Sequence, residues 1–232
     1  MPIPEKIFVS IIVPVYNEEK TIGEIIKRIK NVKYSKNFEI IVVNDGSTDN
    51  TAKILQSIDG IKILNNKINL GKGFSLRKAF GQARGEILII QDADLEYNPK
   101  EHLKLLDQFK DLSVNVVFGS RFKNKNHHPR YYLLYWGNLL LSFLTRILYF
   151  QNISDMETCY KVFRKKVLKD IQLKCNRFDF EPEFTCKLIK NGYKIYEIPI
   201  SYQSRSYGEG KKIKFSDGLR AIFILFKLRF SN

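Results

Sequence analysis

Apolar and polar residues follow two different periods through the first half of the chain. Residues 7–13 form an apolar, β-branched run that ends at Pro14, and such a run predicts a buried strand of a parallel sheet. Isoleucines then recur at helical spacing over residues 19–29, which predicts an amphipathic helix. The same analysis predicts strands over Phe38–Val43, Ile61–Leu64, Glu86–Ile90 and Val114–Phe118, and helices over Thr48–Ile58, Gly73–Arg84 and Pro99–Phe109.

Repeated strand–helix units of this length indicate an α/β fold, with a mostly parallel sheet and helices on both faces. Polar residues follow the ends of the predicted strands, at positions 14–18, 44–47, 91–94 and 119–121. Ligands of such sheets bind beyond the carboxyl ends of the strands. We therefore expect these four strand ends to converge on one site.

After Arg121 the chain changes character, and residues 131–150 are mostly Leu, Tyr and Phe. The stretch has about the ~20 residues that span a bilayer, but Asn138 and Arg146 interrupt it. A spanning helix, a buried or oligomer-forming helix and a helix in the membrane interface all stay open. Trp136 and the flanking tyrosines favour the interfacial helix, because amphipathic rings settle at the level of lipid headgroups.

A second aromatic and basic segment, Phe215–Phe230, repeats this composition near the C-terminus. We therefore divide the chain into a catalytic domain over residues 1–212, with an interfacial helix inserted at 131–150, and a C-terminal amphipathic basic helix over 213–232. The interfacial helices add a membrane-surface element to the α/β fold.

The chain is strongly basic, with a formal net charge of +15. That excess suits a polyanionic partner, which can be nucleic acid, anionic lipid or a phosphorylated substrate, but general lysine richness explains it equally well. The basic residues are dispersed and no nucleic-acid-binding motif is present, so we expect no nucleic-acid partner. Three cysteines without CxxC spacing suggest a reducing compartment, and residues 1–6 lack the pattern of a signal peptide, which together predict a cytoplasmic location.

Asp92 and Asp94 carry the strongest chemical signal. Two carboxylates at positions i and i+2 after a buried strand repel each other, and Mg²⁺ or Mn²⁺ would neutralise them through oxygen ligands. An aspartate-rich turn that caps the next helix is the alternative. Asp45, at the end of a neighbouring strand, favours the metal site, because three unpaired acids would otherwise crowd one cleft.

These residues belong to a series of motifs that resembles family 2 glycosyltransferases of the GT-A fold, and among them the dolichol-phosphate mannose synthase-like enzymes. The resemblance covers nearly the whole chain. The matching segments are Pro14–Glu18, Val43–Asp49, Asn69–Gly73, Asp92–Leu95, Gly119–Arg121, Asp155–Lys161 and Phe180–Glu183.

The resemblance implies a role for each matching residue. Asp92 and Asp94 would be the metal-binding pair of a DXD motif, and Glu96, where relatives often have Gln, would join the metal shell or face solvent. The residues that it implies for the nucleotide-sugar pocket are Pro14, Tyr16, Glu18, Val43, Asp45, Asp92, Ala93, Asp94, Arg205 and Lys211. The basic loop Gln203–Lys212 would be a lid over the diphosphate, whereas Asn69–Gly73 is either a tight turn or a direct contact with the donor.

An acceptor side follows from position. Arg121 ends the last predicted strand beside the site, where its guanidinium would hold an acceptor phosphate, and Arg130, before the aromatic helix, would either meet a lipid phosphate or form a solvated basic turn. We predict Asp94, Arg121 and Arg205 as the catalytic residues. We expect direct in-line attack by a polyprenyl phosphate oxygen with inversion at the anomeric carbon. The phosphate is already anionic, so no strong general base is needed.

The predicted activity is therefore hexose transfer from a nucleotide sugar, GDP-mannose or UDP-glucose, to a polyprenyl or dolichyl phosphate, by an enzyme peripheral on the cytoplasmic face of the membrane. An acceptor without a phosphate, on the same fold, is the alternative, and a basic nucleic-acid-binding domain is a more remote one. The sequence leaves the sugar, the choice between Mg²⁺ and Mn²⁺, and the oligomeric state open.

Overall fold

The computed structural model describes residues 8–34, 38–124, 129–206, 208, 210, 212–213 and 215–231. A seven-stranded sheet with the strand order β3-β2-β1-β4-β6-β5-β7 forms the centre of the fold. The strands are β1 Val9–Val15, β2 Phe38–Asn44, β3 Lys62–Asn65, β4 Ile87–Ile90, β5 Val116–Ser120, β6 Lys161–Arg164 and β7 Ile195–Pro199. Only β6 runs antiparallel to its neighbours, β4 and β5, in this described sheet.

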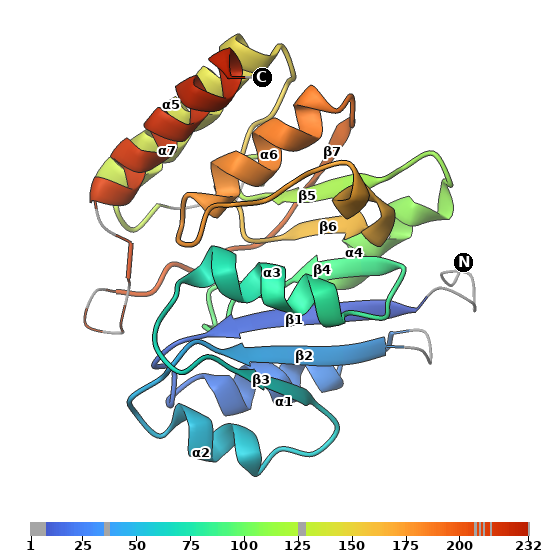
Figure 1. Ribbon diagram of the computed structural model, residues 1–232, viewed down its shortest axis with the longest axis vertical. Coiled ribbons are helices and arrows are strands. Elements are labelled where there is room, and N and C mark those ends of the chain that lie inside the picture. The colour runs from blue at the N-terminus through green and yellow to red at the C-terminus, as the bar shows by residue number, and fades with distance from the viewer. Residues whose placement is uncertain are drawn as a thin grey trace.

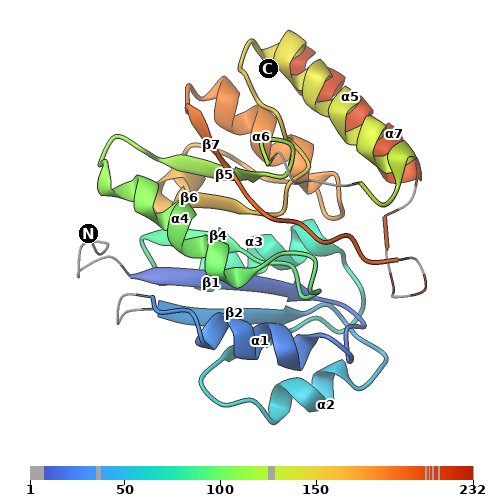
Figure 2. The same ribbon diagram turned by 180° about the vertical axis from the view of Figure 1, so that it is seen from behind.

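Helices cover both faces of this sheet. The α-helices are α1 Ile22–Lys30, α2 Thr51–Gln56, α3 Lys72–Gln82, α4 His102–Asp107, α5 Tyr132–Tyr149, α6 Phe180–Lys190 and α7 Phe215–Phe230. Short 3₁₀ turns are η1 Pro99–Glu101, η2 Gln108–Lys110 and η3 Lys165–Lys169. Helices α3 and α6 lie on the face seen in Figure 1. Figure 2 shows α1 and α4 on the opposite face.

Strands β1 and β4 at the centre of the sheet are almost entirely apolar, because both faces of the sheet are covered. Every residue of β4 is fully buried, and so are Ile11, Ile12 and Val13 of β1. On α1, the isoleucines at helical spacing face this core, as their spacing predicts. The predicted α/β architecture, a mostly parallel sheet with helices on both faces, is confirmed.

The four predicted strand ends meet at one edge of the sheet. Strand β5 is not next to β4, because the antiparallel strand β6 is inserted between them, but β4 and β5 still point the same way. The sequence analysis predicted neither β6 nor β7. It did predict the edge at which the carboxyl ends of β1, β2, β4 and β5 lie.

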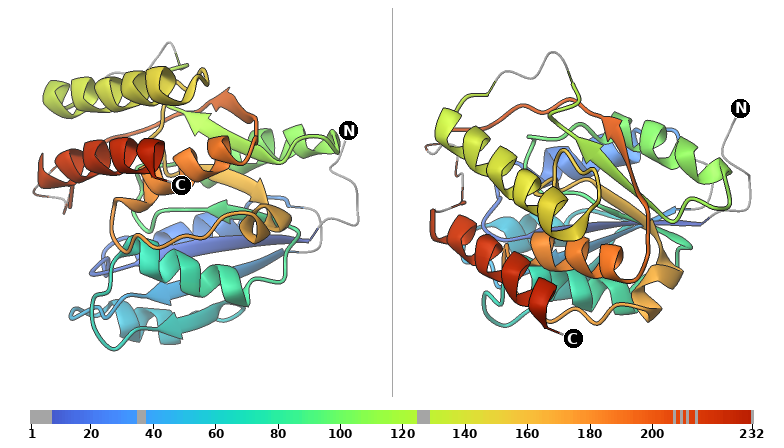
Figure 3. Two further views of the ribbon diagram at one scale, coloured as in Figure 1. Left: turned by 45° about the horizontal axis from the view of Figure 1, so that its top comes forward. Right: turned by 90° about the horizontal axis from the view of Figure 1, so that it is seen from above.

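Helices α5 and α7 lie side by side at one end of the molecule (Figure 3). Tyr149 of α5 donates a hydrogen bond of 2.8 Å to the Leu225 carbonyl of α7. Large apolar side chains remain exposed on this pair, which we call the apolar helix face. Its members are Tyr132, Leu133, Trp136, Leu140, Phe143, Ile147, Leu219, Phe223, Phe226 and Phe230.

Helix α5 is not buried within the chain's own fold, since Trp136 is 64% exposed and Leu133 77% exposed, whereas the oligomer-forming helix stays an open alternative. Among the described helices, none combines the length and apolar character that crossing a membrane requires, so the spanning alternative is also wrong. The interfacial helix stays a prediction, as does the division of the chain at residue 212.

Candidate active site

A row of alternating charges runs inward from Asp92, a partly exposed residue two positions after the end of β4. The Lys72 ammonium, at the start of α3, lies 2.8 Å from Asp92 Oδ1 and 3.0 Å from Glu181 Oε1 on α6. Lys161 of β6 is completely buried, and its ammonium lies 2.5 Å from the other oxygen of Glu181. Acid and base therefore alternate from the sheet edge into the core, and each buried charge has an opposite neighbour.

Lys72 sets the ionisation of Asp92. Burial alone would raise the pKa of Asp92, but the charge and hydrogen bond of Lys72 hold that pKa below its usual range. The pKa of the Lys72 ammonium is shifted in turn. Burial alone would lower the pKa of Lys72, whereas Asp92 and Glu181 contribute to raising it well above its usual value. Asp92 is consequently a carboxylate at neutral pH.

Asp94 has the opposite character. It is 8% exposed, and burial raises its pKa to about 8, with further contributions from the charges of Asp92 and Glu96. Arg205 partly offsets this effect, with Nη2 of its guanidinium 3.4 Å from Asp94 Oδ2. The site therefore holds more negative charge than its own cations neutralise, and Asp94 retains a proton instead.

The segment 201–206, which we call the strap, crosses the site. Nη1 and Nη2 of Arg205 each donate a 2.9 Å hydrogen bond to the Glu18 carboxylate at the end of β1. The Lys212 ammonium lies 2.7 Å from the same carboxylate. Burial alone would raise the pKa of Glu18, but these two cations hold it below its usual range. The strap thus closes over the ends of the strands, where the sequence predicts a lid.

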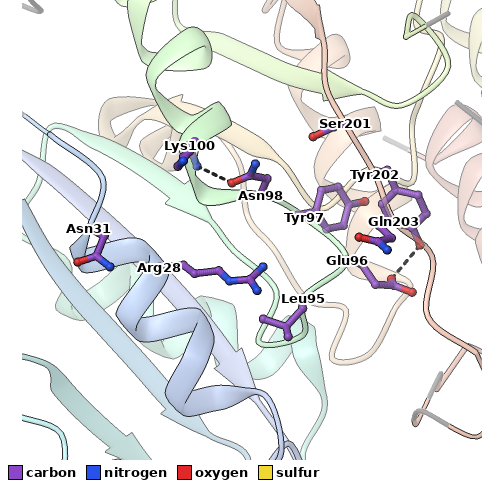
Figure 4. A pocket seen from close by; sticks show the side chains of 10 residues that line it. All are labelled: Arg28, Asn31, Leu95, Glu96, Tyr97, Asn98, Lys100, Ser201, Tyr202 and Gln203. Carbon is purple, nitrogen blue, oxygen red and sulfur yellow. Dashed lines mark hydrogen bonds between the residues drawn. The ribbon is translucent and has the colours of Figure 1, made fainter. Parts of the chain in front are cut away.

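The Glu96 carboxylate holds the strap in place. Its carboxylate accepts hydrogen bonds of 2.8 Å from the Tyr202 hydroxyl and 2.8 Å from the Arg205 backbone N–H. Figure 4 shows Glu96, Tyr97 and Tyr202 along one wall of a cavity of about 470 Å³, with Arg28 on the opposite side. Glu96 thus turns towards the strap in this structure, and its place in a metal shell stays a prediction.

The nucleotide side of the predicted pocket is only partly accessible. Pro14 and Tyr16 are partly exposed at the end of β1, and the Lys212 ammonium lies 5.6 Å from the centre of the Tyr16 ring. Val43 is completely buried and Ala93 is 5% exposed. Their side chains are therefore largely shielded from the surface, and a role of Val43 and Ala93 in binding the nucleotide sugar stays a prediction.

Asp45 has a structural role that the sequence did not reveal. Its carboxylate accepts hydrogen bonds from Asn66 Nδ2 at 2.7 Å and from the backbone N–H groups of Leu70 at 3.0 Å and Gly71 at 2.7 Å. Gly71 has a φ of 101°, a conformation that suits glycine. Residues 69–73 therefore form a tight turn that opens α3 and places Lys72 against Asp92, as one of the two open alternatives predicts.

Arg121 is held differently from the prediction. Its Nε and Nη2 atoms donate to the two carboxylate oxygens of Asp155 at 2.8 and 2.7 Å, and its side chain is 8% exposed. This bidentate ion pair uses two of the three guanidinium nitrogens, so Asp155 holds Arg121 in place and does not leave the whole guanidinium to an acceptor phosphate. Arg130, by contrast, is exposed and bonds the Ser204 carbonyl of the strap at 3.4 Å.

A divalent cation fits the charges at Asp92 and Asp94. Among the described residues, no three acidic, histidine or cysteine side chains are grouped as a complete metal site. Mg²⁺, however, commonly uses one or two carboxylates together with the phosphate oxygens of a substrate. Asp92 is ionised, and a cation would displace the proton that Asp94 otherwise retains. Lys211, also predicted to bind the donor, lies outside the described residues.

Two residues of this region were missed by the sequence analysis. Lys161 is a completely buried lysine, and only the tertiary contact with Glu181 shows why it can be buried. Glu157 lies four residues before it and is partly exposed. The motif Asp155–Lys161 contains both, but no spacing rule distinguishes them from loop residues.

Comparisons with known proteins show what this chain is similar to. The model of the family described as "Glycosyl transferase family 2" matches residues 10–172. The chain is 30% identical over 210 residues to a dolichol-phosphate mannosyltransferase of Pyrococcus furiosus, covering 88% of this chain but 58% of that enzyme. It is 29% identical over 244 residues to a UDP-N-acetylglucosamine–dolichyl-phosphate N-acetylglucosaminyltransferase of Methanococcus voltae, covering 95% of this chain and 96% of that enzyme.

Among solved structures, glucosyl-3-phosphoglycerate synthase from Mycobacterium tuberculosis has a similar fold. Its complex with UDP aligns with a TM-score of 0.76 at 16% identity, covering 97% of this chain and 80% of that one. Its complex with Mn²⁺, UDP and glucosyl-3-phosphoglycerate aligns with a TM-score of 0.73 at 16% identity, covering 96% and 80%. At this identity the likeness is one of fold.

Proposed function

Because the chain belongs to glycosyl transferase family 2, we propose that it transfers a sugar from a nucleotide sugar to a polyprenyl or dolichyl phosphate. The observation that carries the proposal is the pair Asp92 and Asp94, at the end of β4 and under the strap. The names of two relatives, which specify dolichyl phosphate with mannose and with N-acetylglucosamine, support the acceptor class. The sugar stays open between them, and glucose is a third candidate.

The donor side follows from the charges of the site. Mg²⁺ or Mn²⁺ would be held by Asp92 and Asp94, and when bound it would supply positive charge to the leaving nucleoside diphosphate. Tyr16 offers an aromatic face for the base of the nucleotide. Arg205 occupies the carboxylates of Glu18 and Asp94 in this structure, and a diphosphate would compete with them for its guanidinium.

The transfer itself needs little proton chemistry from the protein. An acceptor phosphate oxygen attacks the anomeric carbon in line, the bond from that carbon to the diphosphate oxygen breaks, and the nucleoside diphosphate leaves with the electron pair. The configuration at the anomeric carbon is therefore inverted. The chain contributes by orienting both substrates and by stabilising charge that develops on the leaving group.

The acceptor assay tests this proposal. The protein is incubated with labelled GDP-mannose, UDP-glucose and UDP-N-acetylglucosamine, each with polyprenyl phosphate or with the same polyprenol lacking phosphate. We expect one donor to label the phosphorylated lipid and no donor to label the free alcohol. Transfer to the alcohol would instead support the acceptor without a phosphate and reject the proposed function.

The lipid would reach the site from the apolar helix face, so we further propose that the chain binds the membrane surface through α5 and α7, on the cytoplasmic side. Trp136 and Phe223 lie on different helices of this face and are 64% and 63% exposed. Inserting exposed aromatic side chains into the interface contributes about 1.5–3 kcal/mol each. Arg130, exposed beside the strap, would meet the lipid phosphate.

We expect the double substitution Trp136→Ser with Phe223→Ser to weaken binding to vesicles of anionic phospholipid by roughly a hundredfold, because two insertion energies are lost together. Vesicle cosedimentation measures the effect. Leu112→Ser is the matched control, since Leu112 is 77% exposed but lies between η2 and β5 rather than on the apolar helix face. Equal loss of binding in the control, or none in the double variant, would contradict the proposed membrane contact.

A further inference from the structure

The segment 155–159 connects two walls of the site. At its first residue, the Asp155 carboxylate holds Arg121 beside the strap, where the guanidinium lies 5.1 Å from the centre of the Tyr202 ring. At its last residue, the thiol of Cys159 donates a 3.8 Å hydrogen bond to the Ile90 carbonyl at the end of β4. Glu157 lies on this segment, two residues after Asp155 and two before Cys159, and Arg121 is among the charged groups that act on its carboxyl.

The same segment contacts the helix that would face lipid. The Met156 backbone N–H donates a 3.1 Å hydrogen bond to Ser142 Oγ, which is buried on α5. Glu157 follows immediately in the chain and is partly exposed. The segment that carries Glu157 therefore contacts α5 through Met156 and the end of β5 through Asp155 and Arg121.

The Glu157 carboxyl has unused hydrogen-bonding capacity. Its Oε1 atom is buried and has no hydrogen-bond partner among the described residues. The charged groups around it are Arg121 after β5, Asp155 on the same segment, Lys161 on β6 and Glu181 on α6. A buried polar group without a partner costs free energy unless a ligand supplies one, so its retention here needs an explanation.

Both neighbouring cations are already occupied. Arg121 gives two guanidinium nitrogens to Asp155. The Lys161 ammonium contacts Glu181 and donates to the carbonyls of Met156 at 2.9 Å and Thr158 at 2.6 Å. Burial, together with the negative charge of Glu181, accordingly raises the pKa of Glu157 to about 7. Near neutral pH this carboxyl still carries a proton in much of the population.

We propose that Glu157 is a positioning residue for the acceptor, whose neutral carboxyl donates a hydrogen bond to an oxygen of the acceptor phosphate. This inference rests on the proposed function. An ionised carboxylate would repel a phosphate anion, whereas a protonated one offers the O–H donor that a phosphate oxygen accepts. An arriving phosphate also adds negative charge beside Glu157, which favours retention of the proton, so acceptor binding and proton uptake are coupled.

The proposal makes a specific prediction about pH. As the pH rises through neutrality, Glu157 loses its proton, and the KM for polyprenyl phosphate should rise towards tenfold for each further pH unit while kcat changes little. Glu157→Gln keeps a donor that does not titrate, so this Glu157-dependent rise should disappear. Glu157→Ala has no donor and should raise the acceptor KM about tenfold at pH 6.

The experiment measures kcat and acceptor KM from pH 6 to 9 for the wild type, the two Glu157 variants and Glu24→Gln. Glu24 is the matched control because it is an exposed glutamate on α1, paired with Arg28 at 2.7 Å. Ionisation of the lipid phosphate is the same for every enzyme variant. A difference between the pH profiles of two variants therefore comes from the protein. Circular dichroism and thermal unfolding at each pH establish that the variants are folded.

Loss of the pH-dependent rise in KM in Glu157→Gln, with the rise kept in Glu24→Gln, supports the proposal. A collapse of kcat in Glu157→Gln at unchanged KM would overturn it and identify Glu157 as a general base for a hydroxyl acceptor. A pH profile of the acceptor KM that is the same in Glu157→Gln as in the wild type would also overturn the proposal, while the proposed function would still stand. A wild-type enzyme that transfers nothing to polyprenyl phosphate would overturn both.

Discussion

Asp94→Asn is expected to lower kcat for sugar transfer by about a thousandfold or more while leaving the fold intact. The amide cannot carry the negative charge that a divalent cation requires, and loss of charge stabilisation on the leaving group typically costs factors of this size. The protein itself should tolerate the change. Burial and the charges of Asp92 and Glu96 raise the pKa of Asp94 to about 8, so the metal-free chain at pH 7 already holds mostly the neutral acid.

Two measurements on Asp94→Asn check this account. Steady-state transfer with Mn²⁺ gives kcat, and thermal unfolding in chelator at pH 7 gives a midpoint that should not fall below that of the wild type. Asp59→Asn, in the exposed turn before β3, is the control and should leave both quantities unchanged. An Asp94→Asn enzyme that keeps a tenth of its activity would contradict the assigned role, and an unfolded variant would contradict the predicted tolerance.

Asp155→Ala is expected to destabilise the protein by about 3–5 kcal/mol, because it leaves the buried Arg121 guanidinium without its carboxylate. Asp155 is completely buried and bonds Arg121 through the side chain and through the backbone N–H at 2.8 Å. Urea unfolding monitored by circular dichroism measures the loss. The paired substitution Arg121→Met with Asp155→Leu removes both charges and should recover most of the stability.

This second result also decides what Arg121 does. If Asp155→Ala costs less than about 1 kcal/mol, the pair is not structural. Arg121 would then be available for the acceptor phosphate, as its position in the sequence predicts. The geometry favours the structural role, since the ion pair is bidentate and its arginine side chain is 8% exposed.

The edge of the sheet at which the site lies was predictable because the strands that lead to it have a simple pattern. Strands β1, β2 and β4 are largely buried on both faces and therefore consist mainly of apolar residues. Strand β6 was not predictable in this way. Its sequence Lys-Val-Phe-Arg begins with a buried lysine, and local pattern alone gives no reason to bury a charge.

The site was predictable where one short segment carries the chemistry, as at Asp92 and Asp94. It was not predictable where partners lie far apart in the chain. Arg121 and Asp155 are separated by 34 positions, and the strap residue Arg205 meets Glu18 across 187 positions. Asp45 could be recognised as an acid at a strand end, but its bonds to the turn before α3 depend on tertiary structure.

Sugar transfer with and without metal tests the central claim most directly. The wild-type chain, stripped with EDTA, is given a labelled nucleotide sugar and vesicles containing polyprenyl phosphate, and then Mn²⁺ or Mg²⁺ is restored. We predict negligible labelled glycosyl lipid in EDTA and recovery of transfer on addition of the cation, with inverted configuration at the anomeric carbon. Undiminished transfer in EDTA, or a product with retained configuration, would contradict the account.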